Sequence, residues 1–142
     1  MAAKKQAISV EPRTFLTVTS RQVATFDRVK NQIRQLYEEI STLSKKSPDG
    51  AVNKFKLSFI NEKLNQANEI LGDESKPFSQ FTTFDEDSLP TNSDVVMMLS
   101  QYLDALETWR SARVHYSEFH YYWNTEGRNN IETDEPSRYS DA

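Results

Sequence analysis

The feature that most constrains this chain is an uninterrupted run from Ser93 to Trp123 that contains neither glycine nor proline. Good helix formers dominate its first half, and large apolar residues recur at alternating steps of four and three. This spacing predicts one long helix with a single apolar seam, about 45 Å in length at 1.5 Å per residue. The other apolar segments are expected to pack against it. The seam consists of Val95, Leu99, Tyr102, Leu106, Trp109, Tyr116 and Trp123, and Arg113 and His120 occupy the two remaining positions of the series.

Two earlier segments also have helical periodicity. A heptad-like seam runs through residues 20–46, and a broader apolar face runs through residues 51–71, just before Gly72. Ser47-Pro48-Asp49-Gly50 between them is a strong turn signal and predicts antiparallel neighbours. The expected fold class is therefore all-α. We expect an elongated antiparallel three-helix bundle, with helices at about 20–46, 51–71 and 93–124 and a long Phe-containing connection between the second and third.

The length of 142 residues suits one ordinary domain. Three glycines and five prolines are too few for the many turns of a sandwich or barrel. We expect a flexible N-terminal arm over residues 1–13, a helical domain over residues 14–124, and an acidic, flexible tail over residues 125–142.

The chain has no cysteine, which excludes disulfides and thiolate chemistry and fits a reducing compartment. No apolar run approaches the roughly 20 residues of a membrane span, and no apolar stretch follows the N-terminal lysines as in a secretory signal. The expected location is cytoplasmic, without membrane contact.

The net charge of −4 conceals an asymmetry along the chain. Residues 1–60 hold 11 Lys and Arg against 5 Asp and Glu, whereas residues 61–109 hold 2 against 10. Charge complementarity between a basic first helix and acidic later parts explains this pattern best. A basic surface for nucleic acid is the alternative, but a pI near 5.2 disfavours it.

Aromatic residues crowd the end of the third predicted helix. On a regular helix they would surround the axis, so the chain encloses them, a partner protein does, or they stack on nucleic-acid bases with Arg110 and Arg113 as nearby cations. Tyrosine and tryptophan favour a protein interface because they combine large rigid area with a polar tip. The candidate partner-binding residues at this end are Tyr116, Phe119, Tyr121, Tyr122 and Trp123.

The connection between the second and third predicted helices contains Phe78, Phe81 and Phe84, one at every third residue. A connection of this length without secondary structure is uncommon and often functional. Its phenylalanines either fold over the helices as a lid or insert into a groove on a partner. These three residues are the second set of candidate partner-binding residues.

The two histidines suggest an enzymatic alternative. Arg110 and His115 are separated by four residues, and Arg113 and His120 by six. Both spacings resemble the R-x4–6-H motif of the HEPN family of helical ribonucleases. The resemblance covers about a dozen residues. It implies metal-independent RNA cleavage at a dimer interface, with His as acid and base and Arg holding the phosphate. Arg113 and His120 would then share one helical face.

The sequence lacks the residue patterns of metal sites and of phosphate-binding loops. His115 and His120 are five apart, which separates them by about 140° on a helix, so no metal site is expected. No phosphate-binding glycine motif is present, and no cofactor is expected. The function expected from sequence is a non-enzymatic accessory subunit or adaptor that binds another protein chain or itself. The alternatives are the HEPN-like ribonuclease and a nucleic-acid-binding subunit of a larger complex.

Overall fold

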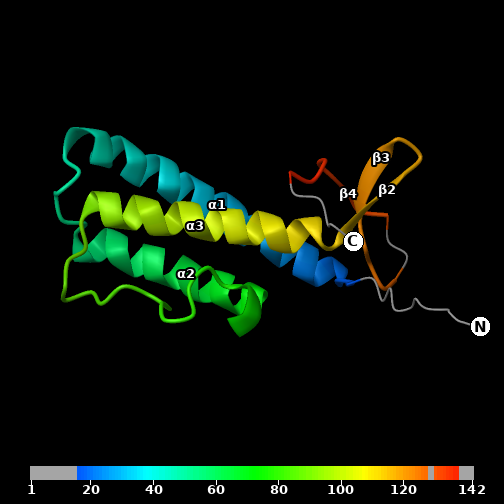
Figure 1. Ribbon diagram of the computed structural model, residues 1–142, viewed down its shortest axis with the longest axis horizontal. Coiled ribbons are helices and arrows are strands. Elements are labelled where there is room, and N and C mark those ends of the chain that lie inside the picture. The colour runs from blue at the N-terminus through cyan, green and yellow to red at the C-terminus, as the bar shows by residue number, and fades with distance from the viewer. Residues whose placement is uncertain (1–15, 128–129, 138–142) are drawn as a thin grey trace, which may run out of the picture. The chain divides into compact units, whose positions relative to one another are not determined.

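The computed structural model describes residues 16–127 and 130–137, so the predicted arm at 1–13 lies outside the described residues. Within these ranges the chain forms three helices and one three-stranded antiparallel sheet (Figure 1). The helices are α1 (Ser20–Lys46), α2 (Lys54–Ser75) and α3 (Asn92–Ser111). The strands are β2 (Val114–Ser117), β3 (His120–Trp123) and β4 (Glu132–Thr133).

The prediction of an all-α fold is wrong at the end of the third helix. α3 ends at Ser111, and Arg113 N donates to Arg110 O in a tight last turn. The residues that follow are mostly β-branched or aromatic, which suit a pleated surface better than a helix. Residues 114–123 therefore form a hairpin instead of the last part of a helix reaching residue 124. The molecule is mostly helical with a small sheet.

The chain divides into two compact units. We call residues 24–109 the helical unit. The sheet unit is the described part of residues 1–23 and 110–142.

Short polar motifs fix where the helices begin. Thr19 Oγ1 accepts a hydrogen bond from Gln22 N while Gln22 Oε1 accepts one from Thr19 N, a reciprocal capping box at the start of α1. Asn53 accepts from Lys56 N at α2. Thr91 accepts from Asp94 N at α3. Each cap satisfies a backbone donor that has no partner inside its helix.

Turns and breaks also follow local signals. Gly50 N donates to Ser47 O across the predicted turn between α1 and α2. Gly72 has a φ of 71°, which L-residues with a side chain adopt reluctantly, and it interrupts the regular part of α2 before a last turn that ends at Ser75.

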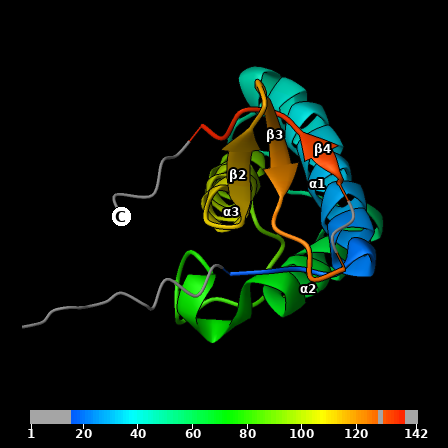
Figure 2. The same ribbon diagram turned by 90° about the vertical axis from the view of Figure 1, so that its right-hand side faces the viewer.

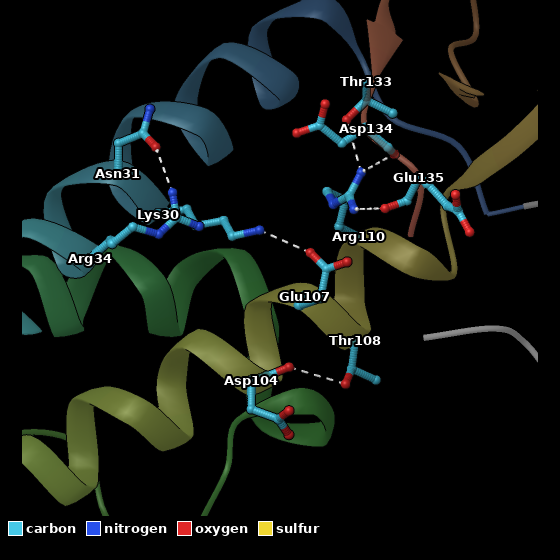
Figure 3. A network of polar contacts seen from close by, with 10 residues as sticks. All are labelled: Lys30, Asn31, Arg34, Asp104, Glu107, Thr108, Arg110, Thr133, Asp134 and Glu135. Atoms are coloured by element: carbon cyan, nitrogen blue, oxygen red, sulfur yellow. Dashed lines mark hydrogen bonds and ion pairs between the residues drawn. The ribbon is translucent and has the colours of Figure 1, made fainter. Parts of the chain in front are cut away.

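The helical unit is held by one apolar interior to which all three helices contribute; Figure 1 shows them side by side. Phe26 of α1 stacks on Trp109 of α3 with ring centroids 5.3 Å apart. Close by, Lys30 pairs with Glu107 at 2.9 Å, both side chains largely buried (Figure 3). The fully or nearly fully buried residues include Val29, Ile33, Ile40, Leu57, Ile60, Leu64, Ala67, Val95, Leu99, Tyr102 and Leu106.

The sheet unit is built on an antiparallel sheet with strand order β2-β3-β4, visible in Figure 2. β2 pairs with β3 so that His115 lies opposite Tyr122, and β3 pairs with β4 so that Tyr121 lies opposite Thr133. Val18 adds a single parallel bridge to Thr125. Part of the segment expected as a flexible tail, Glu132–Thr133, thus forms the third strand.

Among the described residues, none of the helices is long and apolar enough to cross a membrane.

Candidate functional site: an aromatic hairpin

The β2–β3 hairpin closes through a two-residue turn made of Glu118 and Phe119. Their φ angles are 49° and 73°, and positive φ at both central residues is the signature of a type I′ turn. This turn matches the natural twist of paired strands, but it favours Asn and Gly because other side chains crowd the backbone there. Neither favoured residue is present.

Phe119 lies at the tip of this hairpin and is 87% exposed. It is the most exposed large apolar side chain among the described residues. The aromatic ring is therefore exposed to solvent in the folded chain. Its residue also has a positive φ, which residues with a side chain adopt reluctantly. Neither its burial nor its backbone geometry explains why a phenylalanine occupies this position.

Two tyrosines continue the apolar surface from the tip along one face of the sheet. Tyr116 and Tyr121 lie directly opposite each other, with ring centroids 5.0 Å apart in an edge-on arrangement. Tyr116 is 58% exposed, whereas Tyr121 is half-buried. Trp123, on the same face further from the tip, is only 2% exposed and belongs to the interior of the sheet unit. Of the five predicted residues here, Trp123 is not accessible in the folded chain.

The opposite face of the hairpin carries the histidines. His115 Nδ1 lies 2.6 Å from Asn124 Oδ1, and His120 Nδ1 lies 3.0 Å from Glu132 Oε2. Tyr122 lies opposite His115 and two residues after His120 on the same strand. Its ring centroid is 6.1 Å from that of His115 and 6.3 Å from that of His120. Each histidine thus has a separate partner. Within the described residues, no group of three His, Cys, Asp or Glu side chains could hold a metal ion.

Arg110 is committed to the structure of the sheet unit. Its side chain is buried, and Nη1 donates to Thr133 Oγ1 at 2.8 Å and to Asp134 O at 2.9 Å, while Nη2 donates to Glu135 O at 3.2 Å. Figure 3 shows this guanidinium directed at the segment after β4. These charge-assisted bonds hold that segment against the end of α3.

The expectation that Arg113 and His120 share one helical face is wrong, because neither residue lies in a helix. Arg113 lies in the turn between α3 and β2, and burial lowers the pKa of its guanidinium. His120 opens β3 and faces Glu132. Arg110 and His115 likewise lie on different elements. The spacing of the motif is present, but the helical geometry that the resemblance implies is not.

The second candidate set is differently placed. In the Phe-containing connection, Phe81 contacts Phe84 and Tyr102, with ring centroids 5.0 and 6.3 Å apart. Asn61 of α2 is buried and bonds both the N–H and the C=O of Phe84, at 3.0 and 2.9 Å. Asn68 donates to Thr82 O and accepts from the Tyr102 hydroxyl. These contacts favour the lid interpretation for Phe81 and Phe84.

Phe78 differs from the other two phenylalanines of the connection. It is 43% exposed, and its carbonyl accepts a hydrogen bond from Phe81 N. It remains a candidate for contact with a partner.

One further exposed apolar feature lies on the helical unit, where sequence reasoning proposed no site. A shallow pocket of about 260 Å³ is lined by Leu36 of α1 and Phe59 of α2 together with polar side chains. Phe55, 72% exposed, makes an edge-on contact with Phe59 one turn away. The pocket is smaller than usual ligand sites, which occupy about 300–1,000 Å³.

No protein-family model, curated protein or solved structure matches this chain.

Sequence reasoning missed the turn at Glu118-Phe119 and the bonds made by Arg110. The composition offered one signal for the hairpin, because helix formers give way to β-branched and aromatic residues after Arg113. Arg110 offered none, since the carbonyl groups that it bonds are 24 and 25 residues away in the sequence.

Proposed function

We propose that this protein is a non-enzymatic accessory subunit or adaptor that binds another protein through the tip of its β2–β3 hairpin. The antiparallel three-helix bundle expected from sequence would serve as its scaffold. The observation that carries the proposal is Phe119, an almost fully exposed aromatic residue in a turn that disfavours it.

The energetics of Phe119 support a binding role. A left-handed backbone conformation costs an L-residue about 1–2 kcal/mol. Burying a phenylalanine side chain is worth about 1.5–3 kcal/mol, a gain that Phe119 does not obtain in the folded chain. A pocket on a partner would supply that gain. Backbone outliers of this kind cluster at binding sites, which makes this position a reasonable anchor.

The charges around the hairpin indicate the kind of partner. The exposed acidic side chains of the sheet unit are Glu118, Glu126, Glu132, Asp134 and Glu135. Few basic side chains balance these carboxylates. Arg110 is buried and Arg113 is half-buried, so Arg21 is the exposed arginine among the described residues of this unit. An apolar pocket with a basic rim on a partner protein complements this surface. The same charges disfavour nucleic acid, whose phosphates require exposed cations.

Two glycine variants test this proposal. Phe119→Gly removes the ring and suits the positive φ of the turn. Leu89→Gly is the matched control, because Leu89 is also exposed, at 44%, and also has a positive φ, of 47°, but lies in the helical unit. The purified, tagged proteins are incubated in an extract of the source cells, cross-linked, and the captured proteins are quantified by mass spectrometry.

We expect wild type and Leu89→Gly to capture at least one protein in equal amounts. Phe119→Gly should capture about tenfold less of that protein, which corresponds to a loss of about 1.4 kcal/mol in binding free energy. Equal capture of all proteins by Phe119→Gly and wild type would overturn the proposal.

A further inference from the structure

The outer edge of β2 carries backbone groups that the sheet does not use. In an antiparallel ladder, residues alternate between those whose N–H and C=O face the neighbouring strand and those whose groups face away. Asn124 N donates to Arg113 O, and Trp123 N donates to Ile131 O on the β4 side. With the register of β2 against β3, this alternation directs the groups of His115 and Ser117 towards β3 and those of Val114 and Tyr116 outwards.

Within residues 16–127 and 130–137, no hydrogen bond is made to the outward N–H and C=O groups of Val114 and Tyr116. Proteins usually protect such an edge with lysine, proline, a bulge or an inward charge. The sequence of β2, Val-His-Tyr-Ser, contains no lysine and no proline, and its pairing with β3 has no bulge. This edge is therefore able to accept another strand.

The edge is complementary to itself. In an antiparallel pairing centred on His115, Val114 lies opposite Tyr116 of a second copy, and Tyr116 lies opposite Val114 of that copy. Both pairs would have their outward groups facing each other, which gives four backbone hydrogen bonds. A β-branched residue opposite an aromatic residue is a favourable cross-strand pair, and it would cover the exposed ring of Tyr116.

The charges of the strand do not oppose this register. β2 contains no acidic residue or lysine that would repel its copy.

We propose that this chain forms a two-fold dimer through β2, in antiparallel register centred on His115, so that two three-stranded sheets become one sheet of six strands. The surface involved is the edge of the hairpin, and the binding tip at Phe119 is separate from it. The dimer stands independently of the proposed function. If both hold, the dimer would present two copies of the tip, which would increase the apparent affinity for any partner that can bind both copies.

The dimer is tested with two substitutions at Tyr116. Tyr116→Pro removes the outward N–H without removing a bond of the hairpin ladder, since that N–H faces away from β3. Tyr116→Ala is the matched control, because it removes the same ring but keeps the N–H. The mass of each full-length protein is followed by sedimentation over roughly 1 µM to 1 mM.

We expect wild type to dimerise with rising concentration. The dissociation constant of the Tyr116→Ala dimer should exceed that of wild type by less than about tenfold. Tyr116→Pro should remain a monomer. Phe119→Gly should dimerise like wild type, which separates failure of this inference from failure of the proposed function.

Amide hydrogen exchange of the wild type provides a readout that does not depend on whether the proline variant folds. The N–H groups of Val114 and Tyr116 should exchange more slowly as the dimer forms. Those of His115 and Ser117 should be protected at every concentration. A protein that stays monomeric throughout, or a dimer in which Val114 and Tyr116 exchange as fast as in the monomer, would overturn the proposal.

Discussion

Two groups of aromatic residues, each predicted as a possible partner-binding surface, have different surroundings in the folded chain. In the connection before α3, Phe81 and Phe84 contact each other and Tyr102, and asparagines of α2 bond the backbone beside them. At the tip of the hairpin, Phe119 is 87% exposed and its backbone is in the left-handed region. Phe81 and Phe84 thus have contacts within their unit, whereas Phe119 gains little from folding.

The difference shows that aromatic content alone does not identify a binding surface. The informative quantities are how much of each ring is buried and whether the backbone conformation suits the residue. For Phe81 and Phe84 the contacts account for the residues present. For Phe119 they do not, and a role outside the isolated chain remains the better explanation. The free energy of unfolding is the quantity in which this contrast should be visible.

The largest effect is expected when the connection loses two rings. Replacing Phe81 and Phe84 together by alanine should lower the free energy of unfolding by about 2–5 kcal/mol, because half-buried rings and their contacts are removed. Urea denaturation measures the change, with the more exposed Phe78→Ala as control, expected to lose less than about 1 kcal/mol. A double variant as stable as the control would show that the connection is not part of the fold and would remove the contrast.

Asn61 should show the next largest effect. Its buried amide bonds both backbone groups of Phe84, so Asn61→Ala leaves a donor and an acceptor without their partners. We expect a loss of about 1–3 kcal/mol in the free energy of unfolding. Asn65, exposed on the same helix, is the control, and its alanine variant should lie within about 0.5 kcal/mol of wild type. Equal effects at the two positions would contradict the role assigned to Asn61.

Replacing Tyr102 should have a smaller effect on the free energy of unfolding, and this effect should depend on pH. Its hydroxyl donates to Asn68, so Tyr102→Phe should cost about 1 kcal/mol near neutral pH. Burial raises the pKa of Tyr102 above its usual 10.0, and the bond to Asn68 only partly opposes this. The unfolded chain therefore releases this proton first as the pH rises.

The stabilisation linked to Tyr102 should thus be complete below pH 10.0 and be lost as the pH rises through the folded-state pKa. The stability difference between wild type and Tyr102→Phe, measured by urea denaturation from pH 8 to the alkaline limit, should narrow above about pH 10. A difference that stays constant or widens there would contradict the assignment.

Local signals explain why much of the helical unit could be predicted from sequence. The heptad-like spacing of α1, the turn at Ser47–Gly50 and the position of Gly72 all act over a few residues. The caps at Thr19 and Thr91 likewise bond backbone groups three residues further along the chain. Such features depend mainly on neighbours within one or two turns, so one sequence contains enough information to place them.

The end of α3 could not be placed in the same way. Tyr116, His120 and Trp123 continue the helical spacing of the seam, and the turn between them lacks Asn and Gly. What favours the hairpin is pairing with β4 and the bonds from Arg110 to residues 133–135, both of which depend on residues distant in sequence. Ile131 is a single large apolar residue in a polar segment, too weak a signal to predict a third strand.

The most direct test of the central claim, that Phe119 is present for binding and not for folding, is the free energy of unfolding of Phe119→Gly. Glycine adopts the positive φ of the turn without strain, and little buried surface is lost. The account predicts a stability equal to wild type or higher by up to about 1 kcal/mol. A loss of about 2 kcal/mol or more would show that the ring stabilises the fold, and it would contradict the claim.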